Sequence, residues 1–457
     1  MAAAARARVA HLLRQLQRAA CQCPTHSHTY SQAPGLPSSG KTTDYAFEMA
    51  VSNIRYGAGV TNEVGMDLQN MGAKNVCLMT DKNLSQLPPV KIVMDSLVKN
   101  GINFQVYDNV RVEPTDTSFM DAIEFAKKGA FDAYVAVGGG STMDTCKAAN
   151  LYASSPQSEF LDYVNAPIGK GKPVCSPLKP LIAVPTTSGT GSETTGVAIF
   201  DYEHLKVKTG IASRAIKPTL GLVDPLHTLR MPGQVVANSG FDVLCHALES
   251  YTALPYHMRS PCPSNPISRP AYQGSNPISD IWSVQALRIV AKYLKRYVIP
   301  RGQTDTWHVT CLIQNHPEQV CSPDQPMDMK QQTPATSEGI QGLAGLSEIL
   351  MILKQGLICT WQVLLLALAL EMLVFICGAD THTAKIQDAG PVLADTLRKF
   401  LFDLNVDNGL AAIGYSKADI PALVKGTLPQ ERVTKLAPRP QSEEDLSALF
   451  EASMKLY

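Results

Sequence analysis

Apolar residues follow two different patterns along this 457-residue chain. Between about residues 46 and 225, short β-branched runs alternate with stretches of helical spacing, which is typical of an α/β unit. After residue 231 helical periodicity dominates and strand patterns are scarce, which predicts a separate helical unit. The predicted strands are Asn75–Thr80, Phe104–Asp108, Ala133–Val137 and Leu181–Val184, with helices at Val90–Asn100 and Thr117–Lys128.

The first 43 residues follow neither pattern. Four arginines alternate there with leucine and valine, and no acidic residue precedes Asp44. A cationic and an apolar helix face without acidic residues are typical of a mitochondrial transit peptide; the alternative is a disordered tail. We predict a transit peptide and spacer in 1–43, an α/β domain in 44–230 and a helical domain in 231–457.

Composition narrows the range of partners. Forty basic and forty acidic residues balance, which favours neither a nucleic acid nor a membrane surface as the main partner. The eleven cysteines form neither a disulfide framework nor a zinc-finger pattern, so a reducing compartment is expected. Small molecules are the expected partners.

A glycine-rich loop joins the third predicted strand to a helix. Glycines at such a place let the backbone approach a pyrophosphate, and the helix N-terminus adds free N–H groups. Asp144, in the first turn expected for that helix, can also orient the loop. Many Gly-Gly-Gly-Ser sequences are plain turns, but the position between strand and helix favours nucleotide binding. The loop residues are Gly138, Gly139, Gly140 and Ser141.

A second loop, rich in hydroxyl groups, follows the fourth predicted strand at Pro185–Glu193. Its hydroxyls and amides suit phosphate and ribose oxygens; the alternative is a turn that leads to a helix and is capped by Ser192. Asp81, at the end of the first strand, can accept hydrogen bonds from ribose and would repel a 2′-phosphate, which favours NAD over NADP. The alternative for Asp81 is a simple turn former.

Asp242 and His246 stand four residues apart in a helical pattern. On a helix, this spacing puts a carboxylate and an imidazole on one face, where both can bind one divalent cation. Such pairs also arise often by chance.

Taken together, the order of these motifs from Asp81 to His246 resembles the iron-containing alcohol dehydrogenases. The resemblance implies an α/β N-terminal dinucleotide-binding domain plus an all-α C-terminal domain (dehydroquinate synthase-like), with the site between them. It also implies Asp242 and His246 as metal ligands, with Lys147 and Lys179 as less certain cofactor contacts. The implied NAD contacts are Asp81, Gly138, Gly139, Gly140, Ser141, Asp144, Thr186, Thr187 and Ser192.

The leader, the proline-rich loop Leu254–Pro277 and the ending Pro429–Ala437 resemble a mitochondrial branch of that family. The resemblance implies a matrix enzyme with tightly bound NAD and a divalent metal, iron or zinc; a homodimer is one possibility. Its reaction would move a hydride from 4-hydroxybutyrate to 2-oxoglutarate, giving succinic semialdehyde and 2-hydroxyglutarate. Both substrates are carboxylates, and Arg259 and Arg269 are candidate anchors; the alternative is that they are solvated surface arginines.

The resemblance breaks after His246. The family completes its metal site with two later histidines, and none of the later histidines of this chain stands in either motif. In the atypical segment 302–377, the apolar run Leu357–Cys377 is long enough to span a membrane, but it also matches a shifted reading frame of the family's metal helix. Alternative splicing or a mis-predicted transcript, with the frame restored at Gly378, is therefore predicted. The four later histidines are His257, His308, His316 and His382.

Three functional hypotheses stay open at this point. The chain is a competent enzyme of the mitochondrial branch, an ordinary NAD-dependent metal-type alcohol dehydrogenase, or a catalytically impaired variant. The amount of bound metal separates the third hypothesis from the other two.

Overall fold

The computed structural model describes residues 43–298 and 389–457, except positions 50, 206, 271, 431–433 and 435–440. Residues 1–42 of the predicted transit peptide and spacer, the atypical segment 302–377 and three of the later histidines therefore lie outside the described residues.

Six parallel strands form the central sheet, in the order β1-β8-β5-β4-β2-β3. The four strands predicted from the sequence are confirmed to within one residue at each end. The remaining two strands of this sheet were not predicted, because they are only four residues long. The strands are β1 (Asn53–Tyr56), β2 (Asn75–Met79), β3 (Asn103–Tyr107), β4 (Ala133–Gly138), β5 (Leu181–Pro185) and β8 (Leu220–Val223).

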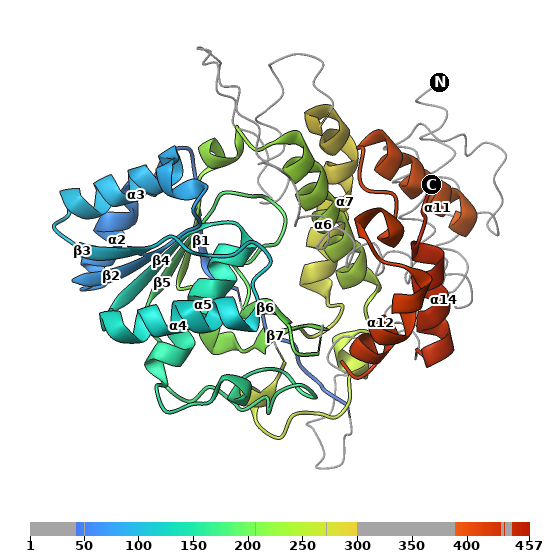
Figure 1. Ribbon diagram of the computed structural model, residues 1–457, viewed down its shortest axis with the longest axis horizontal. Helices are drawn as coiled ribbons and strands as arrows, with labels where there is room; N and C mark the ends of the chain where they lie inside the picture. Colours follow the sequence, from blue (N-terminus) through green and yellow to red (C-terminus); the bar gives the residue numbers. More distant parts are fainter. Residues whose placement is uncertain are drawn as a thin grey trace, which may run out of the picture.

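Helices cover both faces of this sheet (Figure 1). Alternate residues of β2 point to opposite sides, so Val76 and Leu78 belong to one apolar core and Cys77 and Met79 to another. Burial on both faces explains why the central strands are continuous apolar runs rather than alternating ones. The covering helices are α2 (Val64–Asn70) and α3 (Pro88–Lys99) on one face, and α4 (Asp116–Gly129) and α5 (Gly140–Ser154) on the other.

An antiparallel hairpin, β6 (Val197–Tyr202) and β7 (Val207–Ala212), connects the sheet to the helical part of the molecule. Asp201 N–H donates to the carbonyl of Pro114, in the loop before α4, at 2.8 Å. On the other side, Gln430 Nε2 donates to the carbonyl of Lys208 at 3.1 Å. Hydrogen bonds from the α/β part and from the helical part therefore both hold the hairpin.

The part after residue 231 is built of helices around one apolar core. A Cβ atom on Gly240 would lie 2.3 Å from Leu294 Cδ1, so glycine favours the close packing of the two helices that carry these residues. Every described strand ends before residue 224. The helices are α6 (Gly233–Thr252), α7 (Pro277–Val298), α11 (Ala389–Asp403), α12 (Ile420–Thr427) and α14 (Glu443–Ser453).

The predicted fold class is confirmed: an α/β N-terminal part with a parallel sheet is followed by an all-helical part. The exact domain boundaries at 44, 230 and 231 stay predictions. Among the described residues no helix combines the length and hydropathy needed to cross a membrane. The apolar run Leu357–Cys377 lies outside them.

Candidate functional site

The candidate site lies at the carboxyl ends of the sheet strands. The chain runs outward from β2 to the edge strand β3 and returns to β4 on the other side of β2. In open parallel sheets the ligand crevice forms where the strand order reverses in this way. Asp81 follows β2 and Gly139 follows β4, so both candidate residues flank this point.

The two predicted nucleotide loops touch each other. They leave the neighbouring strands β4 and β5, and Thr186 N–H donates to the carbonyl of Gly138 at 3.0 Å. A Cβ atom on Gly139 would lie 3.2 Å from Thr187 Oγ1, and one on Gly140 would lie 2.8 Å from Thr190 Cγ2. The glycines are therefore needed for the contact between the loops as well as for access of a ligand to the backbone.

Lys147 connects the two loops, and its side chain is completely buried. Its Nζ donates to Ser192 Oγ at 2.6 Å, to the carbonyl of Val197 at 2.8 Å and to Asp144 Oδ1 at 3.2 Å. Burial lowers the pKa of Lys147, and Asp144 counteracts this effect. A buried cation with this many acceptors is a structural brace rather than a free ligand group.

Asp144 and Ser192 belong to the same brace, and a contact of either side chain with the cofactor stays a prediction. Asp144 is not in the first turn of α5, because the helix begins at Gly140. Its Oδ1 accepts from Ser192 Oγ at 2.5 Å and its Oδ2 accepts from Ile199 N–H at 2.8 Å. The second loop also continues into β6 rather than into a helix. Both side chains therefore shape the loops from inside.

Buried hydroxyls near the crevice fit a polar ligand such as NAD. Thr80 Oγ1, at the end of β2, and Ser188 Oγ, in the second loop, are buried and have no hydrogen-bond partner within the described ranges. Buried polar groups are nearly always paired in folded proteins. Ribose and phosphate oxygens would satisfy such hydroxyls, so this half of the site suits a dinucleotide.

Asp81 is partly buried and is engaged in its own turn. Its Oδ1 accepts from the N–H groups of Asn83 at 2.8 Å and Leu84 at 3.0 Å. Asp81 therefore does form a turn, as the alternative interpretation held. Only one of its carboxylate oxygens takes part in these two bonds. The ribose contact stays a prediction.

Lys179 does not belong to the candidate site. It stands just before β5, at the amino end of the strand, whereas the crevice lies at the carboxyl ends. Asn150 holds its backbone by two hydrogen bonds of 2.8 and 3.2 Å.

Asp242 and His246 are placed together on α6, as their spacing predicted. His246 Nδ1 lies 3.8 Å from Asp242 Oδ2, and the side chains are 52% and 15% exposed. Burial raises the pKa of Asp242, while His246 lowers it. The donor types suit a divalent cation, and the pair would supply two of its ligands. No cluster of three or more ligating side chains occurs among the residues that the structure describes.

The metal pair and the second nucleotide loop lie close together. A Cβ atom on Gly189 would lie 2.6 Å from the carbonyl oxygen of Ser239, three residues before Asp242 on α6. Glycine at this position therefore lets the loop touch the helix that carries the candidate metal ligands.

Sequence analysis missed Glu113, which is 5% exposed, and its partner Lys208. Glu113 N–H donates to Ser141 Oγ at 3.3 Å, and its Oε2 accepts from Lys208 Nζ at 2.6 Å. Burial raises the pKa of Glu113, Lys208 opposes this, and the charges of Asp201 and Asp242 raise it further. The only available signal was an acid in Val-Glu-Pro-Thr after a strand, which looks like an ordinary turn.

Arg259 and Arg269 are not exposed substrate anchors. Both guanidinium groups bind the carboxylate of Asp44, whose side chain is fully buried, and their own side chains are at most 10% exposed. Gln273 and the backbone of Glu48 exchange two further hydrogen bonds of 2.8 and 2.9 Å. These residues tie the segment after the leader to the loop Leu254–Pro277, and we call them the N-terminal strap.

The comparisons first give the class of protein, the iron-containing alcohol dehydrogenases. The family model for iron-containing alcohol dehydrogenase matches residues 52–225. A solved archaeal Red Sea brine pool alcohol dehydrogenase is 22% identical with a TM-score of 0.70, covering 91% of this chain and 100% of its own. A solved 1,3-propanediol oxidoreductase is 21% identical with a TM-score of 0.68, covering 90% and 100%. At these identities the likeness concerns the fold.

Closer relatives identify the branch. The mitochondrial hydroxyacid-oxoacid transhydrogenases of Rattus norvegicus and Homo sapiens are 76% and 73% identical, and the matches cover all of both chains. A probable one from Dictyostelium discoideum is 46% identical over 91% of this chain and 80% of its own. The chain belongs to the hydroxyacid-oxoacid transhydrogenase family, within the iron-containing alcohol dehydrogenases. It is an oxidoreductase of a mitochondrial type, as the leader predicted.

Proposed function

We propose that the site of this chain serves hydride transfer from 4-hydroxybutyrate to 2-oxoglutarate through a bound NAD in the mitochondrial matrix. The relatives are named hydroxyacid-oxoacid transhydrogenases, which supports a reaction between these two substrate types. The structural observation that carries the proposal is the contact of Gly189 with Ser239, which brings the nucleotide loop to the helix of Asp242 and His246. A hydride donor and its acceptor must meet at such a place.

The residues of the chain divide into two groups of proposed roles. The backbone of Gly138–Ser141 and the N-terminus of α5 bind the pyrophosphate, while Thr186 and Thr187 bind neighbouring oxygens. Asp144, Lys147 and Ser192 keep these loops in place through their buried network.

Asp242 and His246 would hold a divalent metal, iron or zinc, which supplies charge stabilisation for an alkoxide oxygen when it is bound. Asp242 is the more deeply buried of the two, while His246 is more exposed to the solvent. A homodimer stays a prediction.

An isotope-transfer experiment tests the proposal. The full chain is incubated with 2-oxoglutarate and 4-hydroxybutyrate deuterated at the carbinol carbon, without added NAD, and 2-hydroxyglutarate is analysed by mass spectrometry. Deuterium at C2 of the product is expected, because the nucleotide holds the label between the two half-reactions. Product without the label in every sample would contradict direct hydride transfer.

The same experiment separates the proposal from an ordinary NAD-dependent alcohol dehydrogenase. Such an enzyme would release reduced nucleotide and would need added NAD for each turnover. A strong increase of aldehyde formation on adding NAD, with no labelled hydroxy acid, would favour that alternative.

A further inference from the structure

Glu113 is a buried acid in an uncommon backbone conformation. It lies between β3 and α4 with a φ angle of 55°, in the left-handed region that residues other than glycine rarely adopt. Such conformations persist only where surrounding contacts hold them, and they cluster at functional sites. The contacts here are Ser141 in the first turn of α5 and Lys208 on β7.

Only half of the Glu113 carboxylate is satisfied. Its Oε2 binds Lys208 Nζ at 2.6 Å, whereas its Oε1 is buried and finds no hydrogen-bond partner in the part of the chain that the structure describes. A buried carboxylate oxygen without a donor is costly, so a donor from outside the described residues would bind favourably.

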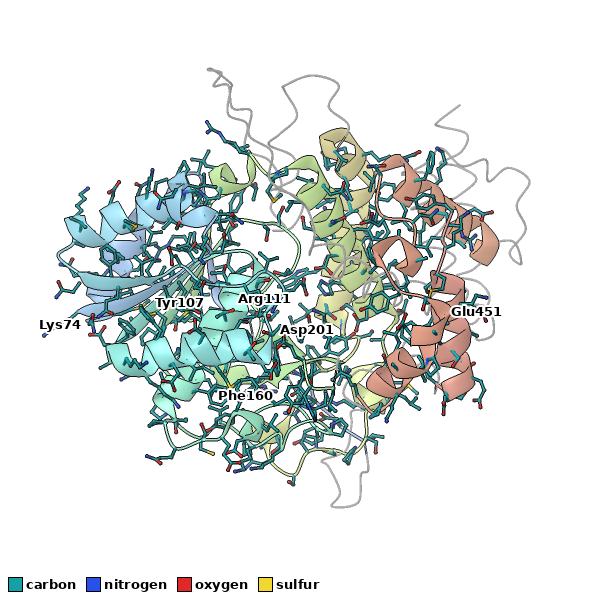
Figure 2. All side chains as sticks on the ribbon, viewed as in Figure 1. Lys74, Tyr107, Arg111, Phe160, Asp201 and Glu451 are labelled. Atoms are coloured by element: carbon teal, nitrogen blue, oxygen red, sulfur yellow. The ribbon has the colours of Figure 1, made fainter. Side chains whose placement is uncertain are left out.

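The surroundings of Glu113 limit what that donor can be. The backbone of Glu113 touches the phosphate-type loop at Ser141, and its carboxylate is within electrostatic range of Asp242, the candidate metal ligand. Asp201, the second acid beside Lys208, lies between the sheet and the helical part (Figure 2). A nucleotide with its pyrophosphate at the N-terminus of α5 and its reactive ring directed toward Asp242 would pass Glu113 with its nicotinamide half.

Charge disfavours the anionic groups of the substrates and of the nucleotide as partners of Glu113 Oε1. The carboxylates of a hydroxy acid or oxo acid and the phosphates of a nucleotide are anionic acceptors, and a carboxylate repels them. The nicotinamide half offers ribose O–H groups and a carboxamide N–H₂ group, and its oxidised ring is a cation. These groups match an anionic acceptor.

We propose that Glu113 is a positioning residue for the nicotinamide half of NAD, from whose ribose or carboxamide its Oε1 accepts a hydrogen bond. The inference deepens the proposed function and rests on it. It assigns to the β3–α4 loop a part in aiming the reactive end of the nucleotide at Asp242 and His246.

Ligand binding to the full-length chain tests this role without requiring turnover. Calorimetry compares the binding of NAD⁺, ADP-ribose and ADP. NAD⁺ contains the nicotinamide ring and its ribose, ADP-ribose contains the ribose without the ring, and ADP contains neither. In Glu113→Gln, NAD⁺ is expected to bind about tenfold more weakly, because a neutral acceptor replaces a charged one. ADP should bind within about twofold of wild type, since the loop contacts remain.

Asp201→Asn is the matched control variant. It removes the other carboxylate beside Lys208, which is 35% exposed and pairs with the lysine at 3.3 Å. This variant should bind all three ligands like wild type. Unchanged ADP binding also shows that both variants are folded.

The outcomes separate clearly. Weaker binding of both NAD⁺ and ADP-ribose supports a contact with the ribose, and weaker binding of NAD⁺ alone supports a contact with the carboxamide. Unchanged NAD⁺ binding in Glu113→Gln, equal losses for ADP, or the same loss in Asp201→Asn would each overturn the role. A wild-type chain that binds none of the three ligands overturns the proposed function itself.

Discussion

Asp81 determines, in our interpretation, which nicotinamide cofactor is preferred. One oxygen of its carboxylate holds the local turn through Asn83 and Leu84, so an alanine substitution would change the charge and the turn together. Asp81→Asn keeps an acceptor for the turn and removes the charge. The preference for NAD over NADP should narrow by about tenfold, because repulsion of a 2′-phosphate is lost. Equal affinity of the unmodified protein for both nucleotides would contradict this role.

Lys147 is the residue whose loss should destabilise the nucleotide half most. Lys147→Met removes the cation and leaves Asp144 as an unpaired buried charge, which costs about 3–5 kcal/mol in the free energy of unfolding. Urea denaturation measures the change.

Lys170→Met serves as the control for this prediction. Lys170 also pairs with two carboxylates, those of Glu159 and Asp162, but its side chain is 51% exposed. Exposed pairs contribute little to stability, so this variant should remain close to wild type. Similar losses of unfolding free energy in the Lys147 and Lys170 variants would show that the buried brace stabilises the protein no more than an exposed ion pair does.

At the scale of elements, the N-terminal strap connects a segment near the start of the chain to the loop Leu254–Pro277. Burial acts to raise the pKa of Asp44, but hydrogen bonds from Arg269, the N–H of Ala46 and Arg259 lower it from 3.8 to about 2. The unfolded chain therefore binds this proton more readily than the folded chain does. The strap contributes its full stability above the unfolded pKa and loses it as the pH falls toward 2.

This linkage predicts a pH-dependent difference between wild type and Asp44→Asn. The difference in the free energy of unfolding should be at least about 2 kcal/mol near neutral pH, because a shift of one pKa unit corresponds to about 1.4 kcal/mol. It should shrink below about pH 4, where the wild-type carboxylate of the unfolded state is protonated. Urea denaturation of both proteins from pH 7 to pH 3 gives the comparison. A difference that is independent of pH would contradict it.

At the scale of the whole molecule, all residues predicted to bind the nucleotide lie within the described ranges, whereas the predicted metal ligands there are Asp242 and His246 alone. The alignment with the Rattus norvegicus relative extends over 486 positions, more than the 457 residues of this chain, so it contains gaps. The predicted replacement of residues 302–377 is compatible with such gaps, and that segment lies outside the described residues.

The expected consequence is weak catalysis. A polarising metal contributes several kcal/mol to alkoxide chemistry, and about 1.4 kcal/mol is a factor of ten, so transhydrogenation should be several orders of magnitude slower than in a relative with both later histidines. The purified chain should hold well under one iron or zinc per molecule. His246→Ala should then change the rate little.

Metal content by mass spectrometry and formation of 2-hydroxyglutarate check this prediction together. Near-stoichiometric metal with turnover like that of the relative, abolished in His246→Ala, would show that other ligands complete the site.

The features that could be predicted from the sequence are those that depend on a local pattern of residues. The strands β4 and β5 are continuous apolar runs, and the spacing of Asp242 and His246 follows directly from helix geometry. The burial of a side chain by partners that are distant in the sequence could not be predicted from such a pattern. Glu113 meets Lys208 from 95 residues away, and Arg259 meets Asp44 from 215 residues away, so an interior acid and an interior arginine both looked like surface residues.

The buried position of Asp44 also constrains how the protein matures. An import peptidase that cuts after this residue would leave Arg259 and Arg269 as two unneutralised interior cations in the finished enzyme. Removal of the leader must therefore stop before Asp44, so the mature polypeptide is expected to begin at or upstream of that position. Amino-terminal sequencing of the protein isolated from mitochondria would reveal the cut.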